Sequence, residues 1–187
     1  MSLKELTLEN HRNAERQDFV KILLSGKIHP DLYATYLYNQ FVKYNLLETI
    51  GMANGCFDNM ADLRRTTAIE KDFVELWTHD DPPKTLSSTD EYVLHMKQHI
   101  SNPQAIMAHI YVHHMGDLSG GQMIKKKVPG AGLFYQFDSD TDYYKQVIRS
   151  KIDDTMVQEA KIAFNFATKL FQELTELDIE YFVAKSD

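Results

Sequence analysis

The residues with the clearest chemical meaning are the glycines and the acid of Gly116-Asp117-Leu118-Ser119-Gly120-Gly121-Gln122. The stretch lies in a segment that otherwise favours helix, where each interior glycine costs roughly 1 kcal/mol relative to alanine. Three glycines in six residues indicate that something there requires a bare backbone. Either another helix packs closely, or the helix bends over a flat or bulky ligand, with the carboxylate of Asp117 near that ligand.

The letters Leu-Ser-Gly-Gly-Gln within this stretch also spell the signature motif of ABC transporter ATPases. Such a domain needs strands and a phosphate-binding glycine loop that ends in Lys and Ser or Thr. The chain has neither pattern, so we exclude this class. Close helix packing and a planar ligand remain as the two interpretations.

His11 is the histidine best placed to bind a metal held in a planar ligand. At helical spacing it shares a face with Leu8, Ala14 and Ile22, which puts an imidazole on an apolar stripe. Glu15 follows one turn later and is near enough to orient the ring. A core histidine that is hydrogen-bonded to a neighbour gives the same pattern and is more common, so His11 alone does not decide the function.

His95/His99 and His109/His113 are two i,i+4 pairs of the kind that a helical zinc site uses. Neither pair carries the glutamate of an H-E-x-x-H motif, and two histidines need further ligands. Chance or surface exposure is therefore the simpler interpretation. Glu159 and the other acids of the last helix are expected to form a solvated face.

Nearly every segment that must position these residues is predicted to be helical. Gly26, Asp80-Asp81-Pro82-Pro83 and Pro129-Gly130-Ala131-Gly132 mark breaks, and Asn102-Pro103 marks a helix start. No stretch alternates as a strand does. The expected helices cover residues 3–24, 30–53, 60–77, 88–100, 102–127, 141–153 and 155–182. We predict one all-α domain over residues 1–187, built as a multi-helix bundle.

The composition excludes several classes of protein. The net charge of −7 argues against general nucleic-acid binding, which needs a basic face. No run approaches 18 apolar residues, so we expect no membrane span. Cys56 is the single cysteine, which fits a reducing compartment. We expect a soluble protein of the cytoplasm or of an equivalent compartment such as the plastid stroma.

Four stretches, taken in order, resemble the heme oxygenase family. Residues 111–122, which read YVHHMGDLSGGQ, resemble the distal-helix signature of that family and are the most specific match. His11-Arg12-Asn13-Ala14-Glu15 resembles its proximal-helix motif. The other two stretches are residues 145–150 and residues 159–164, the latter leading to residues 170–174. Together they span nearly the whole chain.

This resemblance implies a fold in which heme lies between the proximal first helix and the kinked, glycine-rich distal helix. It implies His11 as the axial ligand of the heme iron, with Glu15 near its other nitrogen. Gly116 and Gly120 would lie against the distal heme face. Asp117, anionic at ordinary carboxylate acidity, would order the water that delivers protons. The residues implied to surround the propionates or line the pocket are Lys4, Tyr111, Lys145, Arg149 and Phe164.

The implied activity is oxidative cleavage of heme by O2 and external electrons to biliverdin, carbon monoxide and Fe2+. Heme b is then both cofactor and substrate, and the IXα isomer of biliverdin is the family default. The implied partners are ferredoxin or another reductase as electron donor, and a bilin reductase that consumes the product. A heme-binding or storage protein of the same fold, without turnover, is the alternative. Lys125-Lys126-Lys127 is either a docking patch for an acidic donor or a charge cluster favoured by the helix dipole.

The sequence departs from the family pattern near Asp117. Members commonly carry an arginine and a tyrosine where this chain has His113 and His114. Phe41 is expected to stand where an animal-type member has a tyrosine of the distal water network. We therefore expect the polar network around Asp117 to be built differently here.

Overall fold

The computed structural model describes residues 1–178, and within them the chain is helical and contains no strand. The all-α prediction is confirmed. The α-helices are α1 (Leu3–Leu6), α2 (Leu8–Glu15), α3 (Asp18–Leu24), α4 (Pro30–Ala53), α5 (Thr66–Leu76), α6 (Ser87–His99), α7 (Pro103–Ser119), α8 (Gly121–Ile124), α9 (Thr141–Ser150) and α10 (Val157–Leu177). Short 3-10 helices occupy Ala61–Leu63, Leu133–Tyr135 and Asp154–Met156.

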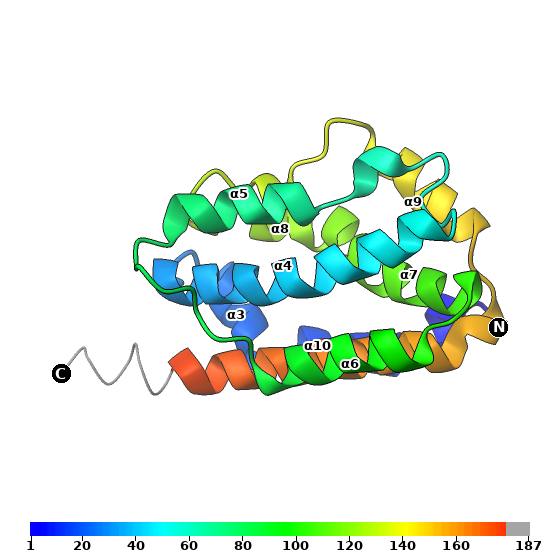
Figure 1. Ribbon diagram of the computed structural model, residues 1–187, viewed down its shortest axis with the longest axis horizontal. Coiled ribbons are helices and arrows are strands. Elements are labelled where there is room, and N and C mark those ends of the chain that lie inside the picture. The colour runs from blue at the N-terminus through cyan, green and yellow to red at the C-terminus, as the bar shows by residue number, and fades with distance from the viewer. Residues whose placement is uncertain (179–187) are drawn as a thin grey trace.

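The last helix holds the bundle together. Figure 1 shows α10 and α6 running side by side along one edge, with α4 crossing above them and α5 above α4. Helix α10 also packs against α2, α3 and α7. Helix α2, which carries His11, and helix α7, which carries Gly116, are therefore positioned by a common support, and neither depends on extensive contact with the other.

The N-terminal segment is three short helices where one helix was predicted over residues 3–24. Ser2 and Glu5 form a capping box that begins α1. The hydroxyl of Thr7 donates to the Leu3 carbonyl at 2.8 Å, which ends the first turn locally. Gln17 has extended backbone and separates α2 from α3. The predicted apolar stripe is therefore wrong in part, because Ile22 lies on another helix and Leu8 is exposed.

Other predicted boundaries also shift. The helix expected from residue 60 begins at Thr66, because its first N–H groups are capped by a carboxylate from α4. Arg65 N and Thr66 N both donate to Glu48. The last helix begins at Val157, after a 3-10 turn that Asp153 caps. Its predicted end near Phe182 lies outside the described residues.

The distal segment is broken at the glycines. The predicted helix over residues 102–127 begins as expected, with Asn102 accepting from Ala105 N and Pro103 in the first turn. It ends at Ser119, and α8 starts at Gly121. The interruption lies at Gly120, whose backbone keeps right-handed helical angles and whose N–H donates to the Gly116 carbonyl.

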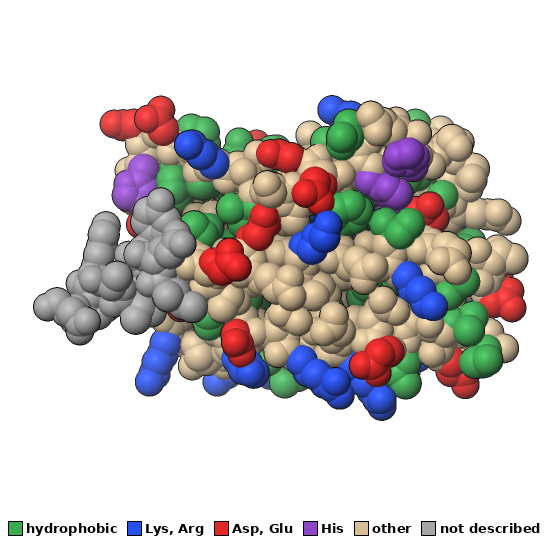
Figure 2. Space-filling view, turned by 90° about the horizontal axis from the view of Figure 1, so that it is seen from below, with side chains coloured by type: hydrophobic (Ala, Val, Ile, Leu, Met, Phe, Trp, Pro, Cys, Tyr) green, Lys and Arg blue, Asp and Glu red, His purple; other side chains and the backbone are tan. Residues whose placement is uncertain are grey.

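The core is rich in buried tyrosine. Tyr33, Tyr44, Tyr92 and Tyr135 are among the largest fully buried side chains. Most of their hydroxyls are hydrogen-bonded to other buried polar groups, so the interior contains polar networks beside its apolar clusters. On the surface seen in Figure 2, acidic and basic side chains intermingle and hydrophobic ones are scattered. None of the described helices is both long enough and apolar enough to cross a membrane.

Candidate heme site

His11 lies on α2 with one ring nitrogen uncommitted. Its side chain is 48% exposed, and its Nδ1 lies 3.4 Å from Glu15 Oε2, as the i,i+4 spacing predicted. Phe164 on α10 packs edge-on against the ring, with centroids 5.7 Å apart. Within residues 1–178 no group hydrogen-bonds to His11 Nε2. The imidazole is held and oriented on one side and is available for a ligand on the other.

The three glycines of the distal stretch divide into two kinds. A Cβ placed on Gly121 would lie 2.4 Å from the buried ring of Tyr135, so Gly121 serves close packing. A Cβ on Gly116 would meet nothing within 4 Å, and one on Gly120 would meet only the Gly116 carbonyl at 3.8 Å. Gly116 and Gly120 are exposed and lie one helical turn apart. Helix packing therefore explains Gly121 and leaves these two as an open, side-chain-free face.

Asp117 points away from that face into the interior. Its Oδ2 accepts a hydrogen bond of 2.8 Å from the hydroxyl of Tyr44 on α4. Burial raises the pKa of Asp117 to about 7, although the Tyr44 hydrogen bond opposes the shift. The carboxyl therefore titrates near neutral pH and not with the ordinary acidity predicted from the sequence. The tyrosine that contacts Asp117 in this chain is Tyr44, which lies about one turn beyond Phe41 on α4.

His114 and His113 belong to two different networks. His114 Nε2 lies 3.0 Å from Glu48 Oε1, which ties α7 to α4 and to the start of α5. His113 Nε2 lies 2.9 Å from the hydroxyl of Tyr92 on α6. Burial lowers the pKa of His113 well below its ordinary value, and nearby Lys43 lowers it further, so this imidazole is neutral.

The last-helix acids and the histidine pairs differ from expectation. His109 and His113 are buried and share Tyr92 as a hydrogen-bond partner, so surface exposure was the wrong interpretation for this pair. Glu159 was assigned to a solvated face, but its Oε2 lies within hydrogen-bond distance of both His95 and His109. These partners are far apart in sequence, so no local sequence pattern predicts that they meet.

The residues implied to bind the propionates are only partly brought together. Burial raises the pKa of Tyr111 on α7, while Thr7, just before α2, and Arg149 on α9 are close enough to oppose that shift. Lys145, on the same helix as Arg149, pairs with Asp142 at 3.2 Å. Lys4 is exposed on α1. The structure thus gathers Tyr111 and Arg149 at the joint between the proximal and distal helices.

The backbone as a whole matches solved heme oxygenases. The heme oxygenase-1 of the cyanobacterium Synechocystis, solved in complex with heme, matches with a TM-score of 0.86 and 26% identity over 98% of this chain and 95% of that chain. The Leptospira interrogans heme oxygenase matches with a TM-score of 0.80 and 27% identity over 92% of this chain and 100% of that one. The fold is that of the heme oxygenases.

Sequence comparison identifies the family directly. The model of the heme oxygenase family matches residues 1–173. The heme oxygenase of Porphyra purpurea is 31% identical, over 92% of this chain and 84% of its own length. Heme oxygenase 2 of Macaca fascicularis is also 31% identical over 93% of this chain, which spans 64% of that longer protein. The chain belongs to the heme oxygenase family.

Proposed function

We propose that the protein cleaves heme oxidatively, using O2 and external electrons, to biliverdin, carbon monoxide and Fe2+. The observation that carries the proposal is the pairing of two unusual features. His11 keeps Nε2 uncommitted on α2, and Gly116 and Gly120 leave a bare backbone face on α7. An aromatic ring as flat as heme fits against a surface without side chains, and an imidazole is a common axial ligand of heme iron.

The residues of the proximal side would hold the heme. His11 Nε2 is the donor available to the iron, while Glu15 and Phe164 fix the ring from the other sides. When bound, heme supplies the iron chemistry that O2 activation requires. Cys56, the only thiol, is buried and hydrogen-bonded to the Pro103 carbonyl, so no thiolate competes with His11.

On the distal side, Asp117 would supply and accept protons. With a pKa of about 7, its carboxyl populates both protonation states near neutral pH, which is the condition for efficient proton transfer. Tyr44 fixes Oδ2 and leaves Oδ1 without a protein partner among the described residues, free to bind water. Gly116 and Gly120 keep the neighbouring face of α7 free of side chains.

Basic residues at the rim would orient the heme. Heme carries two propionates, and Arg149 offers a planar, charged donor beside Tyr111. Lys145 and Lys4 are the further cations that the resemblance to the family implies at the propionates. Which edge of the heme faces inward decides the biliverdin isomer, and we propose the IXα product.

One experiment separates turnover from storage. Ferric heme is added to the purified protein, followed by a reductant and O2, and the absorption spectrum is recorded with time. We expect loss of the Soret band with growth of a bilin band, and loss of turnover in His11→Ala with recovery on addition of imidazole. A stable Soret band under these conditions would establish the storage alternative. An unchanged Soret band and rate in His11→Ala would remove His11 as the ligand.

We propose ferredoxin as the electron donor, bound by the basic run after α8. Lys126 and Lys127 are exposed in a turn directly beyond the distal glycines, whereas Lys125 is half-buried and donates to Gln136. An acidic donor would be attracted there over a range that salt shortens. Ferredoxin-driven turnover should fall steeply with ionic strength and in a Lys126→Glu/Lys127→Glu variant. Turnover driven by ascorbate serves as the control and should be unaffected, and equal loss with both donors would contradict the docking role.

A further inference from the structure

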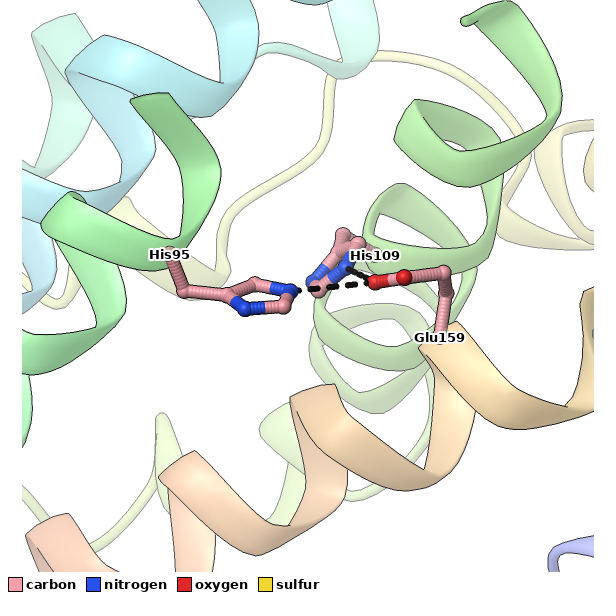
Figure 3. Close-up of side chains that lie close together, drawn as sticks. All are labelled: His95, His109 and Glu159. Atoms are coloured by element: carbon pink, nitrogen blue, oxygen red, sulfur yellow. Dashed lines mark hydrogen bonds and ion pairs between the residues drawn. The ribbon is translucent and has the colours of Figure 1, made fainter. Parts of the chain in front are cut away.

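Three potential metal ligands converge outside the heme site. His95 on α6, His109 on α7 and Glu159 on α10 point toward one another from three helices (Figure 3). Glu159 Oε2 lies 3.1 Å from His95 Nε2 and 2.8 Å from His109 Nε2. All three ligand atoms lie within 4.8 Å of one another.

These distances are close to those of a bound cation. Bonds of roughly 2.0–2.1 Å in tetrahedral geometry place two ligand atoms about 3.3 Å apart. Both nitrogen–oxygen distances are already near that value. Only the distance between the two imidazole nitrogens must shorten, which a small movement of the rings achieves. Two histidines and one carboxylate are a ligand set that Zn2+ and similar divalent ions accept.

The three ligand side chains differ in their exposure to solvent, as a site that exchanges its ion requires. The side chain of His109 is 0% exposed, that of His95 is 16% exposed and that of Glu159 is 26% exposed. Solvent therefore reaches the cluster from the side of His95 and Glu159, where a water molecule would complete the coordination. The deep ligand is oriented from behind, because Tyr92 Oη lies 2.7 Å from His109 Nδ1. A partner on the second ring nitrogen is typical of histidines that bind metals.

The ionisation of the ligands suits a cation as well. The hydrogen bond from His109 holds the pKa of Glu159 at about 2, so the carboxylate is anionic. Burial lowers the pKa of His109, so its imidazole is neutral. For a metal to bind His109 Nε2, the proton that this nitrogen shares with Glu159 must pass to Nδ1.

We propose that His95, His109 and Glu159 bind one Zn2+ ion, or a similar borderline-soft divalent cation, with water as the fourth ligand. Metal on Nε2 makes His109 Nδ1–H the donor to Tyr92. The Tyr92 hydroxyl must then donate to His113 Nε2. Occupancy therefore fixes the direction of a hydrogen-bond chain that ends one helical turn from Asp117.

The test measures metal binding directly, with heme-free protein and ZnCl2 in isothermal titration calorimetry. Because His11 and Glu15 could also attract zinc, the titration is made in a His11→Ala background. We expect one ion per chain. His95→Ala should weaken binding by at least about 100-fold, since it removes a ligand outright. His99→Ala is the matched control, because His99 lies one turn further on α6, is exposed and is outside the cluster. It should bind as the parent does.

A second measurement identifies the site when a variant is destabilised. Co2+ replaces Zn2+, and its visible absorption reports tetrahedral coordination by nitrogen and oxygen in a protein that circular dichroism shows to be folded. Glu159→Gln preserves shape and should abolish the tetrahedral spectrum. Absence of stoichiometric binding in the parent overturns the proposal. Equal affinity in His95→Ala and His99→Ala overturns it too, as does loss of binding in His99→Ala alone.

Discussion

The two kinds of distal glycine should respond in opposite ways to the same substitution. Gly116→Ala adds a methyl group where no protein atom lies within 4 Å. Gly121→Ala adds one 2.4 Å from Tyr135 Cδ1 and 3.0 Å from its Cε1. The first change meets only the space proposed for heme, and the second meets the protein itself.

The expected magnitudes follow from these contacts. In heme-free protein, Gly116→Ala should raise the free energy of unfolding by up to about 1 kcal/mol, because alanine favours an interior helical position. Tyr135 cannot move aside easily, since it stacks on Phe134 with centroids 4.2 Å apart and its hydroxyl pairs with Tyr36 at 3.0 Å. Gly121→Ala should therefore lower the free energy of unfolding by about 1–3 kcal/mol, the usual cost of overpacking.

Turnover should show the reverse order. If the heme lies on the Gly116 face, an intruding methyl group costs a similar 1–3 kcal/mol in the active complex, which is about 5- to 150-fold in rate. Urea denaturation of the heme-free variants gives the stabilities, and bilin formation at saturating heme gives the rates. Bilin formation by Gly121→Ala is measured at a temperature well below the midpoint of its thermal unfolding.

The opposite pattern would refute this division. If Gly116→Ala destabilises the heme-free protein, Gly116 serves packing after all. If it forms bilin at the parent rate, the heme does not rest on that face. If Gly121→Ala is as stable as the parent, the contact with Tyr135 is not the reason for glycine there.

Three further predictions concern buried charge. The pKa of Asp117 in the folded state is about 7, above its ordinary value of 3.8, so between these pH values the folded state binds more protons than the unfolded chain and loses stability as pH rises. Asp117→Asn should remove this pH dependence, which amounts to about 4 kcal/mol at most. The measurement is urea denaturation of the heme-free protein at pH 4–7. Burial lowers the pKa of Lys43 from 10.5 to about 7, so the unfolded chain binds more protons above pH 7 and stability rises toward pH 10. Lys43→Met should flatten that rise and stabilise the protein at pH 7, measured by the same denaturation assay. If stability of the variant still rises with pH as in the parent, the Lys43 ammonium is solvated and does not cause the rise. Glu48→Ala leaves His114 and two backbone donors without their acceptor and should cost about 3 kcal/mol or more in the same denaturation assay, and a cost below 1 kcal/mol would contradict its bridging role.

The sequence predicts well those features that depend on neighbours along the chain. Asn102-Pro103 begins α7 as expected, and the His11–Glu15 pair forms at its helical spacing. The all-α class of the fold could be predicted because no stretch alternates apolar and polar residues as a strand does, and because such caps mark helix starts. Predicted helix boundaries are wrong where the capping residue is distant in sequence. Helix α5 begins at Thr66 because Glu48, 18 residues earlier, accepts its first N–H groups.

Partners supplied by other helices could not be predicted in the same way. Tyr44 and Asp117 are separated by 73 residues, and His109 and Glu159 by 50. Helical periodicity shows that Tyr44 and Phe41 share a face of α4, but not which of the two reaches the carboxyl. Likewise the glycine count showed that bare backbone was needed, and only the position of Tyr135 separates the packing glycine from the open ones.

The burial of α7 explains why the open face must be made of glycine. From Ile106 to Leu118 every residue is at least half-buried except Gly116. Its buried sides carry His109, His113 and Asp117 at four-residue spacing on one stripe, and His114 faces Glu48 on another. Such a helix has no amphipathic pattern from which a ligand face could be read. The proposed ligand face is the one side left bare, where a side chain would fill the space that a flat molecule needs.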